Sequence, residues 1–482
     1  MDNTGYFIGI DIGTSSIKTD VYNESFELIL ECSDKYGYSS NEKEWTEIDP
    51  TIWTTHVHRQ LSQIFEKISC QLIKGIGITG QMHTTVFLDQ DHQPLRPAIM
   101  WNDKRTANII EKIKAELKRT KQTKSIFNIL STGSPLANLI WLMEFEPENY
   151  QRLGKILIAK DYVRYVLTGE LLTDYCDAST SSLYDVIEEK WSEEVIETFQ
   201  IKPSIFPEVN YASNFAGNLD LSLFGIEEQV MIPIVVGTGD NVASVIANQS
   251  QNQPIFSLGT SGVVILTNQE NQWLTTGKNI LAKISANDQR IVTQGALQSG
   301  AKVIEWWSKN IVHQDVTQFE EKLTEKLGEN QVLFLPYLNG DKTLFKNCDL
   351  CGAFYGFNLN HDQTDFTLAV YEGVAFAMKR LLQQMQTEEQ QNILLIGGGA
   401  KSKIWPKIFA NILDKTICIN RVSHEASCGA AMLAYYQLYQ KFPELRNEIQ
   451  EIKPEKKLAK NYQKKYQAFI NFSNALIKKE RR

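Results

Sequence analysis

The sequence predicts an α/β protein built from two domains of related design, and three observations point to this fold class. The chain has 482 residues, which is more than one hydrophobic core usually organises. Apolar runs typical of strands are followed by glycine-rich turns and amphipathic helices. An apolar strand that ends in Gly-Thr-Ser occurs near the start of the chain and again in its second half. This repeat predicts a duplicated fold that binds a ligand between its halves.

The first copy, "FIGIDIGTSSIKTDVY", spans Phe7 to Tyr22 and opens a meander of three strands that continues to about Lys35. The second copy, "IFSLGTSGVVILT", spans Ile255 to Thr267. Each reads as two strands joined by a tight turn of small residues. Such a turn lets backbone N–H groups and hydroxyls approach an anion closely. We therefore expect an anion-binding turn in each half.

A helix, "TIWTTHVHRQLSQIFEKI", is expected after the meander, with Asp49 as its N-cap and Pro50 in its first turn. The next segment, "GIGITG" at Gly75 to Gly80, matches the dinucleotide-binding pattern G-x-G-x-x-G. That pattern requires a helix to open at its end. Here Ile76 and Ile78 alternate with the glycines as in a strand, and "TTVFLD" is another strand. The sequence therefore argues against a nicotinamide site and a simple dehydrogenase.

The remainder of the first half is mainly helical between about Asn108 and Ile201. A buried strand, a glycine-rich turn and a helix follow in "QVMIPIVVGTGDNVASVIAN". The polar run Asn248 to Gln253, ended by Pro254, is the predicted linker.

In the second half, strands are expected at "VLFLPYL" and "ILLIGGGAKS", and helices at "LAVYEGVAFAMKRLLQQM" and "EASCGAAMLAYYQLYQKF". The last forty or so residues are rich in Lys and Glu, with Tyr and Phe at helical spacing. We expect a solvated helix that packs one aromatic face on the body of the protein, rather than a nucleic-acid or membrane arm.

Composition excludes several classes of function. The formal net charge of −8 argues against nucleic acid as the main partner, although a few local donors suffice for a small phosphorylated ligand. The sequence shows neither a basic-then-apolar leader nor an apolar run of membrane-spanning length. Seven scattered cysteines suit reduced thiols in a cytoplasmic protein. Cys348 and Cys351 form a single CxxC, better read as two incidental thiols than as a metal or redox site.

Two carboxylates are candidates for chemistry. Asp11 lies in the first apolar strand, where a charge is costly unless it is paired or faces a ligand. It could cap the turn, or serve as a hard oxygen ligand for Mg²⁺. Asp240 follows "IPIVVGTG" at the end of a buried strand, where open α/β sheets place ligands. Locally, a helix cap and a catalytic role are equally supported.

Polar and aromatic residues that suit a polyol lie in two segments. His83 in "TGQMHTTVFLD" could be a structural donor, or it could bind a hydroxyl group beside Gln81 while Met82 packs against a carbon chain. Trp101 opens "WNDKR", which adds an aromatic wall and charged groups.

Taken in order, these motifs resemble the FGGY family of carbohydrate kinases, within the actin-like ATPase superfamily. The likeness extends from Phe7 to about Tyr439 and is nearest to the xylulokinases. It is carried by "GIDIGTSSIK", "WTEIDPTIW", "GITGQMH", "LRPAIMWNDKR", "KDYVRYVLTGE", "TDYCDAS", "GTGDN", "SLGTSGV", "FLPYLNGDKT", "EGVAFAM" and "GGGAKS". Each motif alone is weak, and their ordered combination is specific.

The resemblance implies two RNase-H-like domains with a cleft between them, at residues 1–248 and 255–440, followed by a helical tail at 441–482. It implies Asp240 as general base on a sugar hydroxyl and Asp11 as the Mg²⁺ ligand. Sugar contacts are carried over to Gln81, Met82, His83 and Trp101. Contacts to ATP are carried over to Asp11, Thr14, Ser15, Lys18, Thr260, Gly300, Gly399, Ala400 and Lys403.

Four residues depart from the pattern of the xylulokinases. Thr84 stands where Gly usually follows the histidine, and Asn138 replaces a lysine in a stretch that is shortened as in sedoheptulokinases. Lys342 replaces an arginine, and Lys403 stands where a polar residue such as Asn is common. These departures bear on which sugar is bound.

The expected activity is transfer of phosphate from ATP to D-xylulose, giving D-xylulose 5-phosphate in the cytoplasm, with a homodimer as the expected assembly. Another FGGY kinase, acting on sedoheptulose, gluconate, ribulose or a related polyol, is the near alternative. A non-kinase actin-like ATPase with a protein partner would need neither the "GQMH" and "WNDKR" pocket nor Asp240. A sugar sensor without turnover would not need Asp11 and Asp240.

Overall fold

The computed structural model describes residues 5–41, 44–117, 130–227, 229–249, 253–269, 274, 276–341, 343–345, 347, 350–385, 392–422 and 424–480. Contacts divide the chain into two units. One unit comprises Met1–Gln249, Ile280–Ile291 and His424–Arg446. The other comprises Ser250–Asn279, Val292–Ser423 and Asn447–Arg482. Lys342, Cys348 and part of the predicted linker lie outside the described residues.

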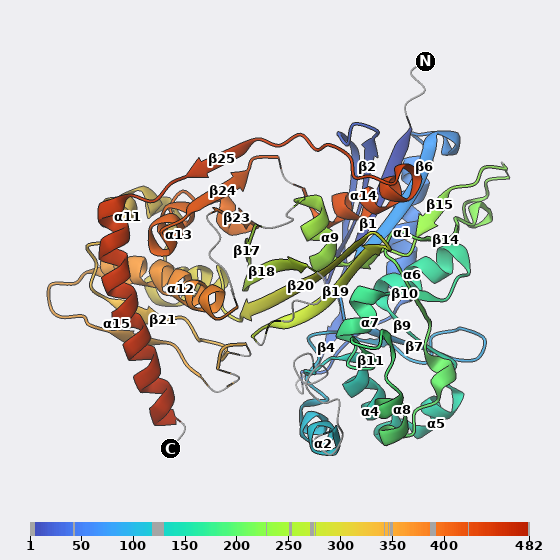
Figure 1. Cartoon of the computed structure of the whole chain (residues 1–482), viewed down its shortest axis with the longest axis horizontal. Coiled ribbons are helices and arrows are strands. Elements are labelled where there is room, and N and C mark those ends of the chain that lie inside the picture. Colours follow the sequence, from blue (N-terminus) through green and yellow to red (C-terminus); the bar gives the residue numbers. More distant parts are fainter. Residues whose placement is uncertain are drawn as a thin grey trace. The chain divides into compact units, whose positions relative to one another are not determined.

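The first unit contains a mixed sheet in the order β14-β15-β6-β1-β2-β3, with β16 also paired to β6 (Figure 1). Strands β1, β2 and β3 are antiparallel and form the predicted meander, whereas β6 runs parallel to β1, β15 and β16. The bounds are β1 Tyr6–Ile12, β2 Ser16–Asn23, β3 Leu28–Lys35, β6 Ile73–Gly80, β14 Phe215–Asn218, β15 Pro233–Val235 and β16 Thr238–Gly239.

A second sheet of this unit has the order β4-β5-β8-β7-β9. Its strands are β4 Ser39–Ser40, β5 Thr46–Ile48, β7 Thr85–Leu88, β8 Ala98–Ile99 and β9 Lys155–Ile158. Two short pairs, β10 Leu172–Asp174 with β13 Glu208–Asn210 and β11 Tyr184–Asp185 with β12 Lys190–Trp191, lie within or beside the segment that the sequence predicts to be mainly helical. The helices are α1 Thr51–Phe65, α2 Ala107–Leu117, α4 Pro135–Phe145, α5 Pro147–Arg152, α6 Ala159–Thr168, α7 Tyr175–Thr180, α8 Glu193–Phe199, α9 Asp240–Ala247 and α14 Ala426–Tyr439.

Gly9 in β1 and Gly77 in β6 let helix α14 approach these two strands closely (Figure 1). A Cβ atom on Gly9 would lie 1.8 Å from the carbonyl oxygen of Ser427, and one on Gly77 would lie 1.8 Å from that of Ala430. No side chain fits at either position. The segment "GIGITG" is therefore a buried strand whose glycines serve helix packing, and the prediction that no helix opens at its end is confirmed.

The core sheet of the second unit has the order β19-β20-β18-β17-β23-β24-β25, although Ile280–Ile291, which covers most of β19 and the start of β20, is assigned to the first unit. Its strands are β17 Ile255–Leu258, β18 Gly262–Gln269, β19 Lys278–Ser285, β20 Asp288–Leu297, β23 Asn392–Ile396, β24 Thr416–Asn420 and β25 Ile449–Ile452, and a separate pair is formed by β21 Leu333–Leu335 and β22 Ala353–Tyr355. The helices are α10 Lys302–Trp306, α11 Glu320–Glu325, α12 Gln363–Met385, α13 Trp405–Leu413 and α15 Lys456–Glu480.

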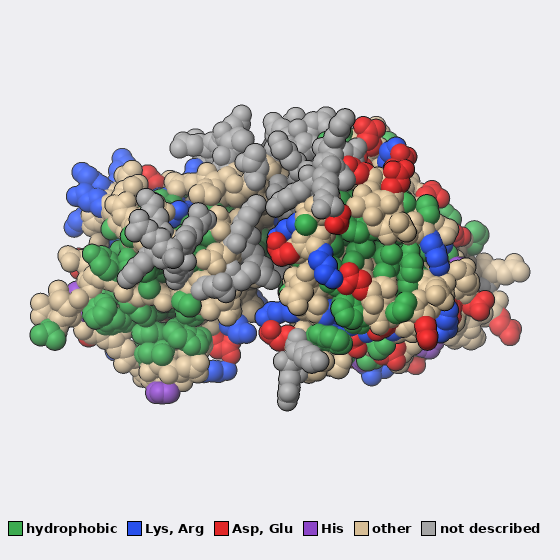
Figure 2. All heavy atoms as spheres, turned by 90° about the horizontal axis from the view of Figure 1, so that it is seen from below, with side chains coloured by type: hydrophobic (Ala, Val, Ile, Leu, Met, Phe, Trp, Pro, Cys, Tyr) green, Lys and Arg blue, Asp and Glu red, His purple; other side chains and the backbone are tan. Residues whose placement is uncertain are grey.

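Figure 1 shows α15 as a long helix, and the burial of its aromatic side chains confirms the predicted aromatic face. Tyr462, Tyr466 and Phe469 are buried in the core of the second unit. Tyr462 donates a hydrogen bond of 2.7 Å to Glu372 on α12. Among the described helices, none is both long enough and apolar enough to cross a membrane. Acidic and basic side chains are interspersed on the face that Figure 2 displays.

Candidate active site

Parallel strand ends bring the two predicted carboxylates to one edge of the first sheet. Asp11 on β1 lies opposite Thr79 of β6, and Thr238 of β16 lies opposite the same residue from the other side. Asp240 follows β16 directly, at the first position of α9. Both carboxylates therefore lie where the carboxyl ends of parallel strands leave room for a ligand.

Asp11 is partly buried, and its Oδ1 atom has no hydrogen-bond partner within the described part of the chain. Burial, followed by the charges of Asp240 and Glu425, raises the pKa of Asp11 to about 7, although Lys18 opposes this change. An ionised carboxylate in this position is costly unless a positive group approaches it.

Asp240 contributes to the first turn of its helix without being the cap. The N-cap is Gly239, and Asp240 Oδ1 accepts a hydrogen bond of 2.8 Å from the adjacent N–H of Asn241. Burial raises the pKa of Asp240 to about 6, although the Asn241 N–H lowers it. The side chain is thus mostly ionised at neutral pH and can accept a proton there.

We predict that Asp11→Asn stabilises the ligand-free protein at about pH 8 and loses this advantage near pH 4. The folded-state pKa of Asp11 is raised to about 7 from 3.8, so the folded protein binds the proton more tightly and loses stability as pH rises between these values. Linkage over this shift sets an upper bound of about 4 kcal/mol, and because Asp11 is only partly buried we expect a gain of about 1–2 kcal/mol at pH 8, or a few degrees in thermal midpoint. The measurement is a thermal melt of both proteins across this range, with Asp49→Asn as the exposed control. Equal midpoints at every pH would contradict the prediction.

Met82 and His83 form the turn between β6 and β7, and Met82 packs against the turn that leads to Asp240. A Cβ atom on Gly239 would lie 2.6 Å from Met82 Cγ. His83 has a φ of +68°, which is unfavourable for a residue other than glycine. Its carbonyl accepts a hydrogen bond of 2.9 Å from Thr85 Oγ1, which in turn accepts one of 3.0 Å from the buried Asn138. Asn138, which departs from the xylulokinase pattern, thus supports the turn at His83 through Thr85.

The other predicted residues of the first unit surround the turn between β1 and β2. Gln81 is buried beside this turn, whereas Trp101 is 46% exposed. Ser15 is exposed, and Lys18 forms an ion pair with Glu425, just before α14. Gly13 N–H donates to Ser16 O at 3.0 Å and closes the turn.

The second turn, between β17 and β18, is also closed by the N–H group of its glycine, although its hydrogen bond spans one residue fewer. Gly259 N–H donates to Ser261 O at 3.0 Å, and Gly300 N–H donates to Thr260 O at 3.0 Å. A Cβ atom on Gly300 would lie 2.2 Å from the carbonyl carbon of Ser261, so only glycine can brace the turn this closely. Gly399 packs against Leu258, because its Cβ would lie 2.5 Å from that side chain. The structure therefore brings Thr260, Gly300 and Gly399 to the end of β17.

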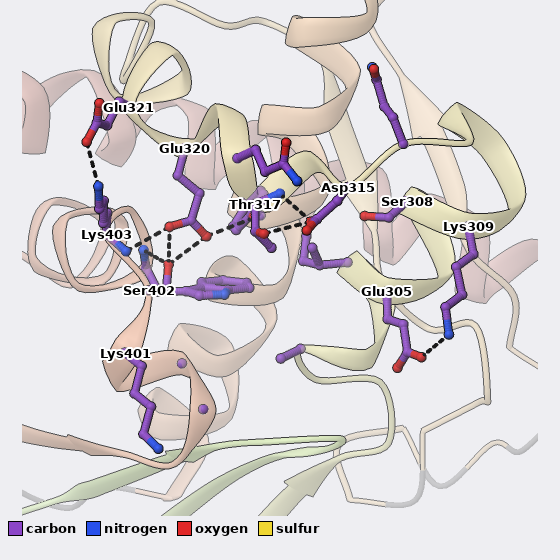
Figure 3. A pocket seen from close by; sticks show the side chains of 18 of the residues that line it. Glu305, Ser308, Lys309, Asp315, Thr317, Glu320, Glu321, Lys401, Ser402 and Lys403 are labelled. Atoms are coloured by element: carbon purple, nitrogen blue, oxygen red, sulfur yellow. Dashed lines mark hydrogen bonds and ion pairs between the residues drawn. The ribbon is translucent and has the colours of Figure 1, made fainter.

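A cavity of about 1170 Å³ opens beside this turn, within the second unit (Figure 3). Gly399 and Lys403 line it, opposite a π-helical turn at Trp307–Val312 that contributes Ser308 and Lys309. Lys403 forms an exposed ion pair of 2.6 Å with Glu321. The cavity is large enough for a nucleoside.

Glu320 was missed by sequence reasoning and holds one wall of this cavity together. Its carboxylate accepts hydrogen bonds from Tyr371 Oη at 3.1 Å, from Ser402 Oγ at 2.9 Å and from Lys403 N–H at 2.7 Å. Figure 3 shows it pointing toward Ser402 and Lys403. The surrounding sequence, "FEEKLTEKL", is that of an ordinary amphipathic helix and carries no signal for this role.

A buried ion network supports the segment that leads to Asp240. Arg164 on α6 donates hydrogen bonds of 2.8 Å to the carbonyl oxygen of Val236 and of 2.8 Å to Asp161. Lys160 lies within 2.6 Å of Asp161, 3.0 Å of Asp174 and 3.1 Å of Asp177, and its side chain is 0% exposed. Residues of the motifs "KDYVRYVLTGE" and "TDYCDAS" therefore contact one another, and Arg164 connects them to the segment that leads to Asp240.

Comparison with known proteins gives consistent results. Residues 6–247 match the N-terminal domain, and residues 255–438 the C-terminal domain, of the FGGY family of carbohydrate kinases. A xylulose kinase of Staphylococcus xylosus is 31% identical over 439 residues, covering 89% of this chain and 90% of the relative.

Two solved structures are similar over nearly the whole chain. A protein described as a xyloylose kinase, from Brucella ovis, has a TM-score of 0.90 at 28% identity and covers 98% of this chain and 99% of its own. A gluconate kinase from Lactobacillus acidophilus has a TM-score of 0.90 at 21% identity and covers 98% of both chains, which at this identity speaks for the fold alone.

Proposed function

The chain belongs to the FGGY family of carbohydrate kinases, and on that premise we propose that it transfers the γ-phosphoryl group of ATP to D-xylulose, giving D-xylulose 5-phosphate and ADP. Family membership confirms the predicted sugar phosphotransferase and the two-domain α/β fold, and it implies ATP as the co-substrate. D-xylulose is supported by the similarity to proteins named as xylulose kinases. Gluconate and related polyols are the alternatives, since a gluconate kinase shares the fold.

The observation that carries the proposal is the meeting of Asp11, Asp240 and the Met82–His83 turn at the carboxyl ends of neighbouring strands. A carboxylate that is mostly ionised at neutral pH lies there beside a partly buried histidine turn. Phosphoryl transfer requires mainly positioning and charge stabilisation, which suits a rigid site of this kind.

In the proposed reaction, Asp240 accepts the proton of the sugar hydroxyl, directly or through one water, as that oxygen attacks the γ-phosphorus. The bond between the γ-phosphorus and the bridging oxygen breaks, and ADP leaves with the electron pair. The proton on Asp240 then passes to solvent. We propose that Met82 packs against the carbon chain, that Gln81 and His83 bind hydroxyl groups, and that Trp101 forms the outer wall.

For ATP, we propose that Thr14, Ser15 and Lys18 of the first unit and Thr260 of the second approach the phosphates through their turns. Gly300 would hold the second turn in place through its hydrogen bond to Thr260 O. Gly399, Ala400 and Lys403 would contact adenosine at the cavity of the second unit. The support for these roles is the tight Gly-Thr-Ser turn that each unit contains and the size of the cavity.

The residues present also fit Mg²⁺. Asp11 Oδ1 is a buried oxygen without a hydrogen-bond partner among the described residues, and Mg²⁺ prefers oxygen ligands. The described residues contain no cluster of three or more His, Cys, Asp or Glu side chains that could hold a metal. One carboxylate with substrate phosphates and water is a usual set of ligands for Mg²⁺. When bound there, the ion would neutralise charge that develops on the phosphates.

The test is ADP release with MgATP and purified protein, across D-xylulose, sedoheptulose, ribulose, gluconate, glycerol and a blank without sugar. We expect D-xylulose to give the highest kcat/KM. A higher kcat/KM for another sugar would make that sugar the substrate, and the assignment as a sugar kinase would still hold. ADP release at the same rate with each sugar and in the blank would contradict the proposed function. The domain boundaries at 248, 255 and 440, and the homodimer, stay proposals that limited proteolysis and light scattering would test.

A further inference from the structure

Thr84 is fully buried between the histidine turn and β7, and its hydroxyl is engaged on two sides. Thr84 Oγ1 donates a hydrogen bond of 2.9 Å to Gln81 Oε1 and accepts one of 3.2 Å from Trp101 N–H. A glycine, which usually stands at this position in the xylulokinase pattern, could make neither contact. The side chain therefore joins two residues that we assign to the sugar.

The same two residues hold the first phosphate turn. Gln81 Nε2 donates to the carbonyl oxygen of Gly13 at 3.1 Å, and Trp101 Nε1 donates to Thr14 Oγ1 at 3.0 Å. The hydrogen bonds thus form a closed ring that runs from Thr84 through Gln81 to the turn, and back through Trp101. Every member of the ring belongs to the first unit.

The ring also sets the direction of the Thr14 hydroxyl. A hydroxyl offers one donor and two acceptor positions. Because Trp101 Nε1–H occupies an acceptor position, the O–H of Thr14 stays available to donate to an anionic oxygen. Trp101 is 46% exposed, so a ligand can contact it without breaking the ring of hydrogen bonds.

We propose that Thr84 is a positioning residue that couples sugar binding at Gln81 and Trp101 to phosphate binding at the Gly13–Ser15 turn. This inference rests on the proposed function, which assigns those residues to the two substrates. A sugar that holds Gln81 and Trp101 in one conformation also holds the Gly13–Ser15 turn in place, because the ring of hydrogen bonds connects them. By linkage, bound ATP must then increase the affinity for the sugar by the same factor by which the sugar increases the affinity for ATP.

The experiment compares wild-type protein with Thr84→Val, which keeps the shape and loses the hydroxyl, and with Thr84→Ser, which keeps the hydroxyl. Calorimetry gives the Kd of a non-hydrolysable ATP analogue with Mg²⁺, in the absence and presence of the sugar with the highest kcat/KM. We expect the sugar to lower this Kd about 5-fold or more in wild type and Thr84→Ser, and by less than about 2-fold in Thr84→Val.

A merely structural role for Thr84 would lower the melting temperature and leave the ratio of the two Kd values unchanged. That result, or a wild type without coupling, would overturn the inference while the kinase stands. If Thr84→Val does not fold, Trp101→Phe opens the ring at Thr14 and should lose the coupling as well. A wild type that releases no ADP in response to any sugar would overturn both the proposed function and the inference.

Discussion

Replacing Asp240 with asparagine is expected to lower kcat for sugar phosphorylation about 1,000-fold or more, because a positioned general base contributes up to about 10⁴-fold. The change is nearly isosteric. An asparagine oxygen can still accept the Asn241 N–H hydrogen bond that Asp240 Oδ1 accepts at 2.8 Å. The variant would therefore present an uncharged amide where the wild type presents a carboxylate that can take a proton.

The binding of substrates and the stability of this variant separate a chemical role from a structural one. We expect the Kd of an ATP analogue to stay within about 3-fold of wild type, because no assigned nucleotide contact is lost. Since burial raises the pKa of Asp240 to about 6, removing the charge should leave the thermal midpoint equal or higher at neutral pH. Asp220→Asn, at an exposed cap, is the matched control. Turnover at the wild-type rate in Asp240→Asn would contradict the assignment of the base.

The same carboxyl predicts the pH profile of the wild type. As pH falls through about 6, Asp240 becomes protonated and can no longer accept the hydroxyl proton, so kcat should decline on the acid side. The residual activity of Asp240→Asn should lack this acid limb.

Much of the first unit could be predicted because local patterns determine it. The meander of β1 to β3 follows from alternation and turn residues, and "GIGITG" follows from isoleucines that alternate with glycine. The reason for those glycines could not be predicted, since it depends on α14, which lies about 350 residues later in the chain and packs on them.

The candidate site shows the same division. Its charged and aromatic residues carried signals of their own, because a carboxylate in an apolar strand or an isolated Gly-Thr-Ser turn is unusual. Glu320 carried no such signal, and Thr84 was marked only as a departure from the xylulokinase pattern, without any indication of its hydrogen bonds. Each acts through partners distant in sequence, such as Ser402 or Trp101, and only the fold brings these together.

The buried ion network is the remaining feature with a large expected effect. Two cations, Lys160 and Arg164, face three carboxyl groups. Burial raises the pKa of Asp177 well above its usual value, although the charge of Lys160 opposes this change. Burial would lower the pKa of Lys160, but the charges of Asp161 and Asp174 outweigh burial and raise it. Lys160 therefore stays charged and compensates the buried carboxyl groups around it.

Lys160→Met should destabilise the protein by about 3–5 kcal/mol, because removing one partner leaves a buried negative charge without compensation. Adding Asp174→Asn to Lys160→Met also removes one buried carboxylate, and it keeps an N-cap for α7, since asparagine caps helices as well as aspartate. We expect the double variant to recover more than half of the loss in denaturant unfolding. Hydrogen exchange should show the loss in α6 and α7, and also in Val236–Asp240, because Arg164 holds the Val236 carbonyl. A single variant as stable as wild type would show that the network neither supports the fold nor orders the segment that presents Asp240.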